Sequence, residues 1–305
     1  MANTLLTPSV IAQAALATLY ETTVAAQLVH RDYDSEFVAR VGDTVTIRKP
    51  AVFVADEFDE TNGINVQNAT ETGVPVALNH WADTSFAVTS KDLALKIENF
   101  REQLLDPAME SISQKIDRDV LTFRNDVTQV VGTSGTWTYD KPESLVDAGV
   151  LLDLAKVPAS QRRVIVGPRT RGEWLKNDLL KRADASGSTA ALREGSIGSG
   201  LWGFDAYMSQ NIGQPKATGA QVTGDPTTEV NVAFHRTAVA LVTRQLELPM
   251  GAANAAIANY KGFGIRVVIG YDQAKKKDVV SLDILYGVKT LDANRAVLIK
   301  GPNKA

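Results

Sequence analysis

The segment ENFREQLLDPAMESISQKIDRDVLTFRNDVTQVV, residues 98–131, carries the longest regular apolar pattern in the chain. Its apolar side chains recur at steps of three or four residues from Phe100 to Val130. This spacing puts them on one face of an α-helix, so the sequence predicts a helix over 98–131. Asp106 and Pro107 interrupt the pattern. Either Pro107 opens the main helix with Asp106 as its cap, or it kinks a continuous helix.

The sequence before this helix has the pattern of β-strands. Short β-prone runs occur at residues 44–48, 74–78 and 85–88. No Lys or Arg lies between Pro50 and Ser90, whereas the same stretch contains Asp56, Glu57, Asp59, Glu60, Glu71 and Asp83. We predict a long two-stranded excursion whose exposed edges are suited to pairing with another chain. Its acidic character suits a basic partner surface.

The sequence after the helix alternates between helical and β-prone runs, which predicts a compact α/β unit. The predicted helices are 142–156 and 169–180, and the predicted strands are 164–166, 204–209 and 238–243. Two Gly- and Ser-rich or polar stretches, 184–200 and 214–228, are predicted loops. Nearer the C-terminus, the runs 264–270 and 279–285 flank a hydrophilic turn and predict a β-hairpin.

The first forty residues are predicted to form an arm. Thr7 and Pro8 make a good helix start, and an apolar stripe at roughly helical spacing follows. Such a stripe must cover either the chain's own core or a neighbouring subunit, and the pattern alone leaves both open.

Composition excludes several classes of function. The chain has 305 residues, 44% of them hydrophobic and 22% charged, and no cysteine, so zinc–thiolate sites and thiol catalysis are excluded. A formal net charge of -3 gives no global preference for nucleic acid. The start lacks the pattern of a signal peptide, and no apolar stretch approaches the roughly 20 residues that span a bilayer. We therefore expect synthesis and folding in a cytoplasm.

The motifs that resemble catalytic or metal sites are incomplete. His30-Arg31-Asp32 mimics the start of a kinase catalytic loop, but Phe37 stands where that motif has an asparagine. The same Phe37 replaces the turn glycine that an EF-hand requires after its first acidic ligands. The glycines of 195–200 lack the Lys-Ser/Thr pair of a phosphate-binding loop. We predict no catalytic, cofactor-binding or metal-binding residue, and no enzyme.

A basic cluster gives a stronger signal than these motifs. Arg162, Arg163, Arg169 and Arg171 lie within ten positions and are followed by further lysine and arginine residues. The cluster is a solvated helix face, a docking surface for an acidic segment of another subunit, or a contact to nucleic-acid phosphates.

Taken in order, these elements resemble the capsid fold named after bacteriophage Hong Kong ninety-seven. Local phrases over 195–211, 231–242 and 279–287 are similar to stretches of that family, the last to the podovirus coat-protein branch. The resemblance covers nearly the whole chain and implies an α+β fold. It implies an N-terminal arm over 1–40, an extended loop over 41–90, a peripheral domain with the spine helix over 91–132 and 245–305, and an axial domain over 133–244.

The resemblance also implies a function. It predicts a major capsid protein that forms hexamers and pentamers of an icosahedral shell around double-stranded DNA, in a virion assembled in the host bacterial cytoplasm. The expected partners are other copies of the chain, a scaffolding protein, a portal protein, non-specifically contacted double-stranded DNA and, as an optional addition, a decoration protein. No cofactor and no membrane are expected.

One departure from the family pattern concerns covalent cross-linking. Some members join neighbouring subunits through a lysine of the extended loop, but this loop lacks lysine except at its base, where Lys49 and Lys91 lie. We therefore predict a non-covalent shell in which multivalent weak contacts act together. The candidate inter-subunit contacts are Asp56, Glu57, Asp59, Glu60, Arg162, Arg163, Arg169 and Arg171. The short chain also leaves little room for a fused scaffolding segment.

Three alternatives remain open at this stage. A bacterial nanocompartment shell would use the same fold to package cargo enzymes instead of DNA. A soluble α/β hydrolase would need a nucleophile and base that the three scattered histidines do not supply. A further alternative is another phage structural protein, such as a tail component.

Overall fold

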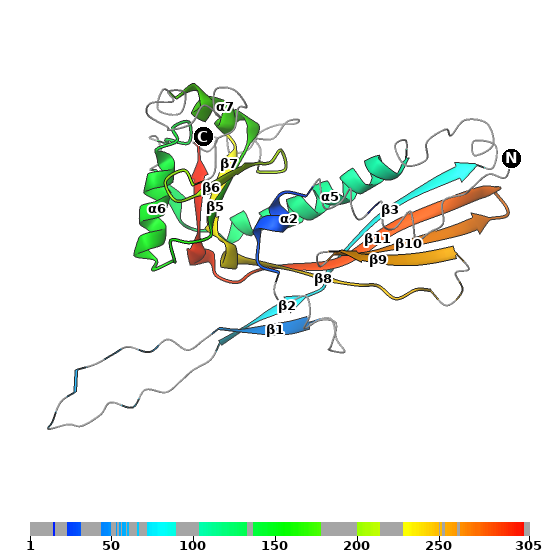
Figure 1. Cartoon of the computed structure of the whole chain (residues 1–305), viewed down its shortest axis with the longest axis horizontal. Helices are drawn as coiled ribbons and strands as arrows, with labels where there is room; N and C mark the ends of the chain where they lie inside the picture. The colour runs from blue at the N-terminus through cyan, green and yellow to red at the C-terminus, as the bar shows by residue number, and fades with distance from the viewer. Residues whose placement is uncertain are drawn as a thin grey trace.

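The computed structural model of the chain describes residues 15, 23–31, 44–49, 53, 55, 57, 58, 60, 66, 72–89, 104–132, 137–177, 200–213, 228–249, 251, 254–260 and 263–301. Within these residues the chain forms two five-stranded sheets, a separate two-stranded ribbon and three longer helices. Figure 1 shows the ribbon extending away from both sheets. The predicted α+β class is confirmed.

The longest helix is α5, Asp106–Leu121, followed by a 3-10 turn, η2, Thr122–Asp126. Pro107 lies in its first turn, and the helix starts at Asp106 itself, so Asp106 is not its cap. The prediction that the helix reaches residue 131 is wrong. The Thr122 hydroxyl donates to the Asp119 carbonyl at 2.5 Å, which tightens the last turn.

The larger sheet lies beneath α5 and is antiparallel throughout its paired strands. Its strands are β3 (His80–Thr89), β8 (Val239–Arg244), β9 (Asn254–Tyr260), β10 (Phe263–Asp272) and β11 (Lys277–Thr290). The order is β3-β11-β10-β9, and β8 pairs with the last part of β11. The predicted C-terminal hairpin is confirmed as β10 and β11, which pair from Arg266↔Asp283 to Asp272↔Lys277.

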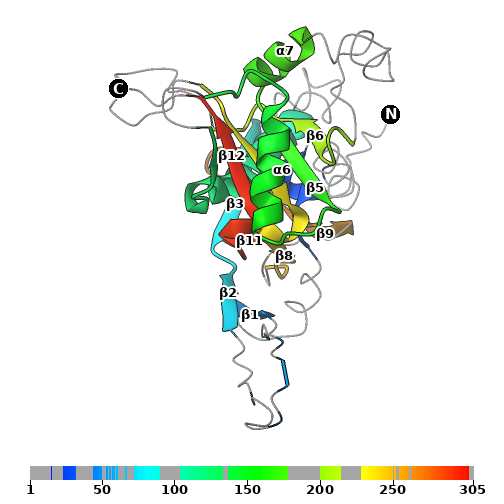
Figure 2. The same ribbon diagram turned by 90° about the vertical axis from the view of Figure 1, so that its left-hand side faces the viewer.

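The smaller sheet has the order β4-β12-β7-β5-β6. Its strands are β4 (Val130–Val131), β5 (Arg162–Val166), β6 (Asp205–Met208), β7 (Val230–His235) and β12 (Ala296–Lys300). Helix α6, Ser144–Leu154, covers one face, and α7, Pro168–Lys176, lies at one end, as Figure 2 shows. Leu145, Leu152 and Trp174 are fully buried in the core of this unit.

The ribbon consists of β1 (Thr44–Lys49) and β2 (Thr72–Ala77), which pair antiparallel from Thr44↔Ala77 to Lys49↔Thr72. The predicted strands at 44–48 and 74–78 are therefore confirmed. The third strand of the predicted extended loop behaves differently. As β3, it pairs with β11 from Lys277↔Thr89 to Tyr286↔His80 and belongs to the larger sheet.

The chain passes between the two sheets three times, once from β3 through α5 and η2 to β4, and twice through short 3-10 turns. One is η3, Arg236–Ala238, between β7 and β8, and the other is η4, Ala293–Arg295, between β11 and β12. The two sheets therefore do not follow the ranges predicted for the two domains. Strand β8 comes from the predicted axial range 133–244 but joins the larger sheet, and β12 comes from the predicted peripheral range 245–305 but joins the smaller sheet. Turns of three residues leave no loop-like stretch in the sequence to mark a boundary.

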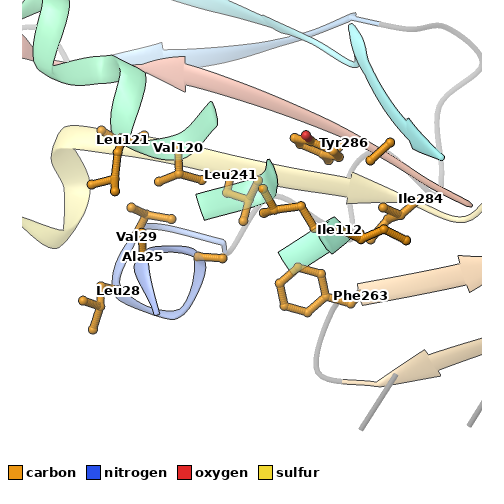
Figure 3. Close-up of a cluster of buried hydrophobic side chains, with 14 of the residues drawn as sticks. Ala25, Leu28, Val29, Ile112, Val120, Leu121, Leu241, Phe263, Ile284 and Tyr286 are labelled. Atoms are coloured by element: carbon orange, nitrogen blue, oxygen red, sulfur yellow. The ribbon is translucent and has the colours of Figure 1, made fainter. Parts of the chain in front are cut away.

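One hydrophobic core continues from the larger sheet through α5 into the smaller sheet. Figure 3 shows part of it, where Ile112, Val120 and Leu121 of α5 lie near Leu241 of β8 and Tyr286 of β11. A short helix, α2 (Ala25–Leu28), lies against the same cluster. Most of the predicted arm and most of the predicted loops 184–200 and 214–228 lie outside the described residues.

Candidate inter-subunit surfaces

The described residues beyond the paired strands of the ribbon are apolar or acidic and exposed. Phe53 and Phe58 expose 61% and 69% of their surface, and the predicted contact residues Glu57 and Glu60 are also exposed. The other two candidates, Asp56 and Asp59, lie outside the described residues. Exposed aromatic side chains beside carboxylates are typical of a surface that another protein covers.

The base of the ribbon is packed onto β8 and β11. Ile47 and Val76 of the ribbon form a small buried cluster with Leu78, Ala240 and Val242. Gly287 of β11 makes this contact possible, because a β-carbon at this position would overlap the carbonyl oxygen of Ala77. The ribbon is therefore a firmly rooted projection and not a free loop at its base.

A polar cluster lies between this base and α5. The Tyr286 hydroxyl donates to Asp119 Oδ2 at 2.5 Å, and Lys115 Nζ lies 3.1 Å from the same oxygen. His80, the first residue of β3, stacks on Tyr286 with ring centroids 5.3 Å apart, and its Nδ1 lies 3.5 Å from Asp119 Oδ2. Sequence reasoning missed this cluster, because its members are far apart in the chain.

Tyr286 should make stability depend on pH in the alkaline range. Burial, followed by the hydrogen bond to Asp119 and its charge, raises the pKa of Tyr286 above its ordinary value of 10.0. The unfolded chain then loses the proton first, so this contribution is fully present below about pH 10 and is lost as the pH rises further. Between about pH 9.5 and 11, we expect the free energy of unfolding to fall less steeply with pH in the Tyr286→Phe variant than in the wild type. Urea unfolding at each pH measures this, and equal slopes would contradict it.

A second cluster lies on the face of the larger sheet away from α5. Arg266 forms a two-pronged ion pair with the buried Asp283 and donates to the Glu247 carbonyl at 2.8 Å. The Trp81 indole N–H donates to Asp283 at 3.2 Å, although the ring itself is exposed. The ion pair fixes Trp81 on an open sheet surface. Trp81 and Val279 are both exposed on this face. Alternation in the sequence predicts that a strand has two faces but does not show which of them is exposed.

The predicted arginine cluster divides into two groups. Arg162 is only 6% exposed, and its guanidinium binds Asp153 Oδ1 and the Val157 carbonyl, both at 2.6 Å. Arg163 donates to the Leu28 carbonyl, and burial lowers its pKa. Both guanidinium groups therefore bind within their own chain, and the burial of Arg162 leaves little of it for another subunit to contact. Arg163 and Arg171 are half-buried and Arg169 is exposed, and all four arginines stay predictions.

The position of Arg169 depends on a cap from a distant strand. The buried Glu229, just before β7, accepts the Arg169 and Thr170 amides at 2.9 Å each. Asn231 accepts the Gly167 amide and donates to the Thr170 hydroxyl, also at 2.9 Å. These side chains satisfy the free amides at the start of α7 and place a carboxylate at its positive end. Sequence reasoning looked only for local caps and missed them.

The outer face of α6 is unexpectedly apolar. Val146, Val150 and Leu154 are exposed at helical spacing, while Leu145 and Leu152 face the core. The sequence showed these residues as apolar but could not separate the two faces, because apolar residues occur on both faces of the helix. Such a helix is normally buried on both sides, so this stripe is a further candidate contact.

The described residues contain few groups arranged to bind a metal ion or to support catalysis. In this part of the chain, no group of three or more His, Asp or Glu side chains could hold a metal ion. His235 lies 2.9 Å from the Thr237 hydroxyl in η3, and burial followed by nearby arginines lowers its pKa. No helix among the described elements is long and apolar enough to cross a bilayer.

Comparisons with known proteins point the same way. The family model described as "P22 coat protein - gene protein 5" matches residues 1–240. No curated protein sequence matches the chain. A structure described as Mycobacterium phage Che8 is similar with a TM-score of 0.64 and 23% identity, covering 90% of each chain.

Two further solved structures are similar over most of their length. The capsid structure of the cyanophage P-SCSP1u has a TM-score of 0.62 and 12% identity, covering 87% of this chain and 85% of that one. A virus-like particle from Pyrococcus furiosus has a TM-score of 0.53 and 12% identity, with coverages of 95% and 97%. At these identities the likeness establishes a shared fold.

Proposed function

Because the chain belongs to the P22 coat-protein family and has the Hong Kong ninety-seven-like capsid fold, we propose that its copies assemble into hexamers and pentamers of an icosahedral shell around double-stranded DNA. It is a major capsid protein, a structural component of a tailed phage and not an enzyme. The observation that carries the assembly proposal is the rooted ribbon, whose exposed aromatic and acidic residues have no cover within the described part of the chain.

The ribbon supports an overlap between neighbouring subunits. Its paired strands leave the body at a buried hydrophobic base, and Phe58, Glu57 and Glu60 lie exposed beyond them. A projection that meets a different surface on the next copy makes a heterologous contact, which closes into rings when the rotation permits. Arg169 and Arg171, with the more strongly engaged Arg162 and Arg163, are the basic candidates for the receiving side. Asp56 and Asp59 are proposed to act with the described acids.

The finer assignments are also proposals. We assign 1–40 to the arm, 41–90 to the extended loop, 91–132 with 245–305 to the peripheral domain and 133–244 to the axial domain. We place the protein in the podovirus branch and in the virion capsid, with assembly in the host bacterial cytoplasm. Its proposed partners are a scaffolding protein, a portal protein, the packaged DNA and a decoration protein. The alternative is a nanocompartment shell, which would use the same fold to package cargo enzymes instead of DNA.

In purified particles, the copies of this chain should not be covalently cross-linked to one another. No lysine lies between Pro50 and Ser90, so the part of the extended loop beyond Lys49 at its base has no amine for an isopeptide bond. We expect mature particles, boiled in detergent and run on a denaturing gel, to give this chain as a single band at the 32.8 kDa of the monomer. A ladder of higher species would contradict a non-covalent shell.

The contents of the same particles test the assembly proposal. Nuclease-protected double-stranded DNA inside closed particles is the expected result. Particles that instead contain a second protein and no nucleic acid would support the nanocompartment alternative and overturn the DNA-enclosing function.

A further inference from the structure

The two crossings made by the 3-10 turns η3 and η4 lie side by side and form a junction between the sheets. The Leu291 and Asp292 amides, just before η4, both donate to the Ala238 carbonyl at the end of η3, at 2.8 and 3.2 Å. Arg295 of η4 donates to the Thr237 hydroxyl of η3 at 2.5 Å. Because the backbone passes directly from one sheet to the other in these two short turns, they must absorb any change in the angle between the sheets.

A segment far away in sequence lies across this junction. We call Thr23–Arg31 the strap; it includes α2 and comes from the predicted N-terminal arm. At one end, the strap binds β8 directly after η3. The His30 amide donates to the Val239 carbonyl, the Leu241 amide donates to the His30 carbonyl, both at 3.0 Å, and the Arg31 guanidinium lies 3.9 Å from the Phe263 ring centroid.

The strap also binds the smaller sheet and the long helix. Arg163 of β5 donates to the Leu28 carbonyl in the strap. Asp117 of α5 accepts the Val24 amide at 2.9 Å and the Ala26 amide at 3.2 Å. Figure 3 shows Ala25, Leu28 and Val29 of the strap beside the side chains of α5 and β8. One short segment thus connects α5 with both sheets.

Asp117 is a costly residue to bury, which indicates a specific task. It is only 1% exposed, and burial raises its pKa while the amides of Val24, Ala26 and Ala25 oppose that rise. A buried carboxylate without hydrogen-bond donors is strongly unfavourable. Asp117 therefore holds the strap in place, and the strap keeps Asp117 satisfied.

We propose that the strap fixes the angle between the two sheets, and that Asp117 is the positioning residue that latches it. When the strap leaves Asp117, the bonds to β8 beside η3 weaken, and the junction of η3 and η4 gains freedom to bend. The relevance to a shell rests on the proposed function, because subunits with the same sequence must fit different local curvature. The latch itself is a property of the single subunit.

Hydrogen exchange on the unassembled full-length subunit tests the latch. Asp117→Asn keeps the size of the side chain but replaces one acceptor oxygen with an NH₂ donor, so it can no longer accept both amides. We expect exchange to rise roughly ten-fold at Val24 and Ala26, at Leu241 and, through the junction, at Leu291 and Asp292. Exchange in α6 should be unchanged.

Two further variants keep the test decisive. Glu110→Gln changes an exposed carboxylate on the same helix and should leave exchange at every one of these amides unchanged. Arg163→Gln removes the hydrogen bond from the smaller sheet to the Leu28 carbonyl of the strap and should raise exchange at His30 and Leu241. This variant tests the strap even if Asp117→Asn fails to fold.

The proposal is overturned if strap amides exchange faster in Asp117→Asn while Leu291 and Asp292 keep wild-type protection. It is also overturned if neither variant changes exchange in β8. Because exchange is read on single subunits, either result is independent of whether the wild-type protein forms shells.

Discussion

Gly287→Ala is expected to abolish assembled particles while the chain is still made. The added methyl group would overlap the Ala77 carbonyl oxygen, and it would also lie 3.0 Å from the Ala77 carbonyl carbon and 3.3 Å from the Leu78 Cα. These are backbone atoms where β2 leads into β3, so no rotamer change relieves the overlap. We expect the ribbon base to shift at a cost of roughly 3 kcal/mol, as overpacked cores do. Particle yield after density-gradient centrifugation measures the effect.

Gly270→Ala is the matched control for this change. Gly270 lies in the neighbouring strand β10, and a β-carbon there meets nothing within 4 Å. This variant should give the same particle yield as the wild type. Normal particle yield from Gly287→Ala would mean that the rooted ribbon base is not needed for assembly.

Glu229→Ala is expected to produce the largest loss of subunit stability. It removes the carboxylate that accepts the Arg169 and Thr170 amides in a buried setting. Unsatisfied buried donors and the lost cap together predict a fall of about 3 kcal/mol in the free energy of unfolding. Urea unfolding of the unassembled subunit, followed by circular dichroism, measures it.

Glu173→Ala controls for the loss of a carboxylate near α7. Glu173 is exposed and pairs with Lys176 at 2.7 Å within one turn of the helix. Exposed pairs of this kind contribute roughly 0.5 kcal/mol or less, so the control should unfold nearly as the wild type does. If both variants lost the same stability, Glu229 would have no special role as a cap.

Local patterns in the sequence predicted the elements that local physics determines. The alternation at 44–48 and 74–78 predicted the ribbon, and the runs at 264–270 and 279–285 predicted the hairpin of β10 and β11. The helical stripe predicted α5 but extended it too far, because Val127 and Val130 continue the spacing after the helix has ended.

Features that depend on contacts across the chain could not be predicted in this way. Asp117 and Glu229 look like ordinary surface carboxylates in sequence, yet both are buried. The strap supplies the donors to Asp117, and the start of α7 supplies the donors to Glu229. Arg162 looked like part of a free basic surface, but Asp153 lies within reach only after α6 has packed on its sheet. A charged residue can be recognised in the sequence, whereas the residue that pairs with it is determined by the fold.

The ribbon and the strap give the subunit two distinct mechanical roles. We propose that the ribbon, rooted by Ile47 and Val76, contacts a neighbouring subunit, while the strap, which binds Asp117, acts inside the subunit. A defect in the first should reduce assembly without changing the junction. A defect in the second should change protection at the junction before any assembly takes place.

Electron microscopy of the purified, expressed protein tests the central claim most directly. A shell protein of this family should form closed, hollow, roughly spherical particles, with scaffolding protein added where it is needed. Particles with rings of five and six subunits, joined through ribbons that overlap the next copy, are the predicted result. Uniform monomers, or open tubes under the same conditions, would contradict the account.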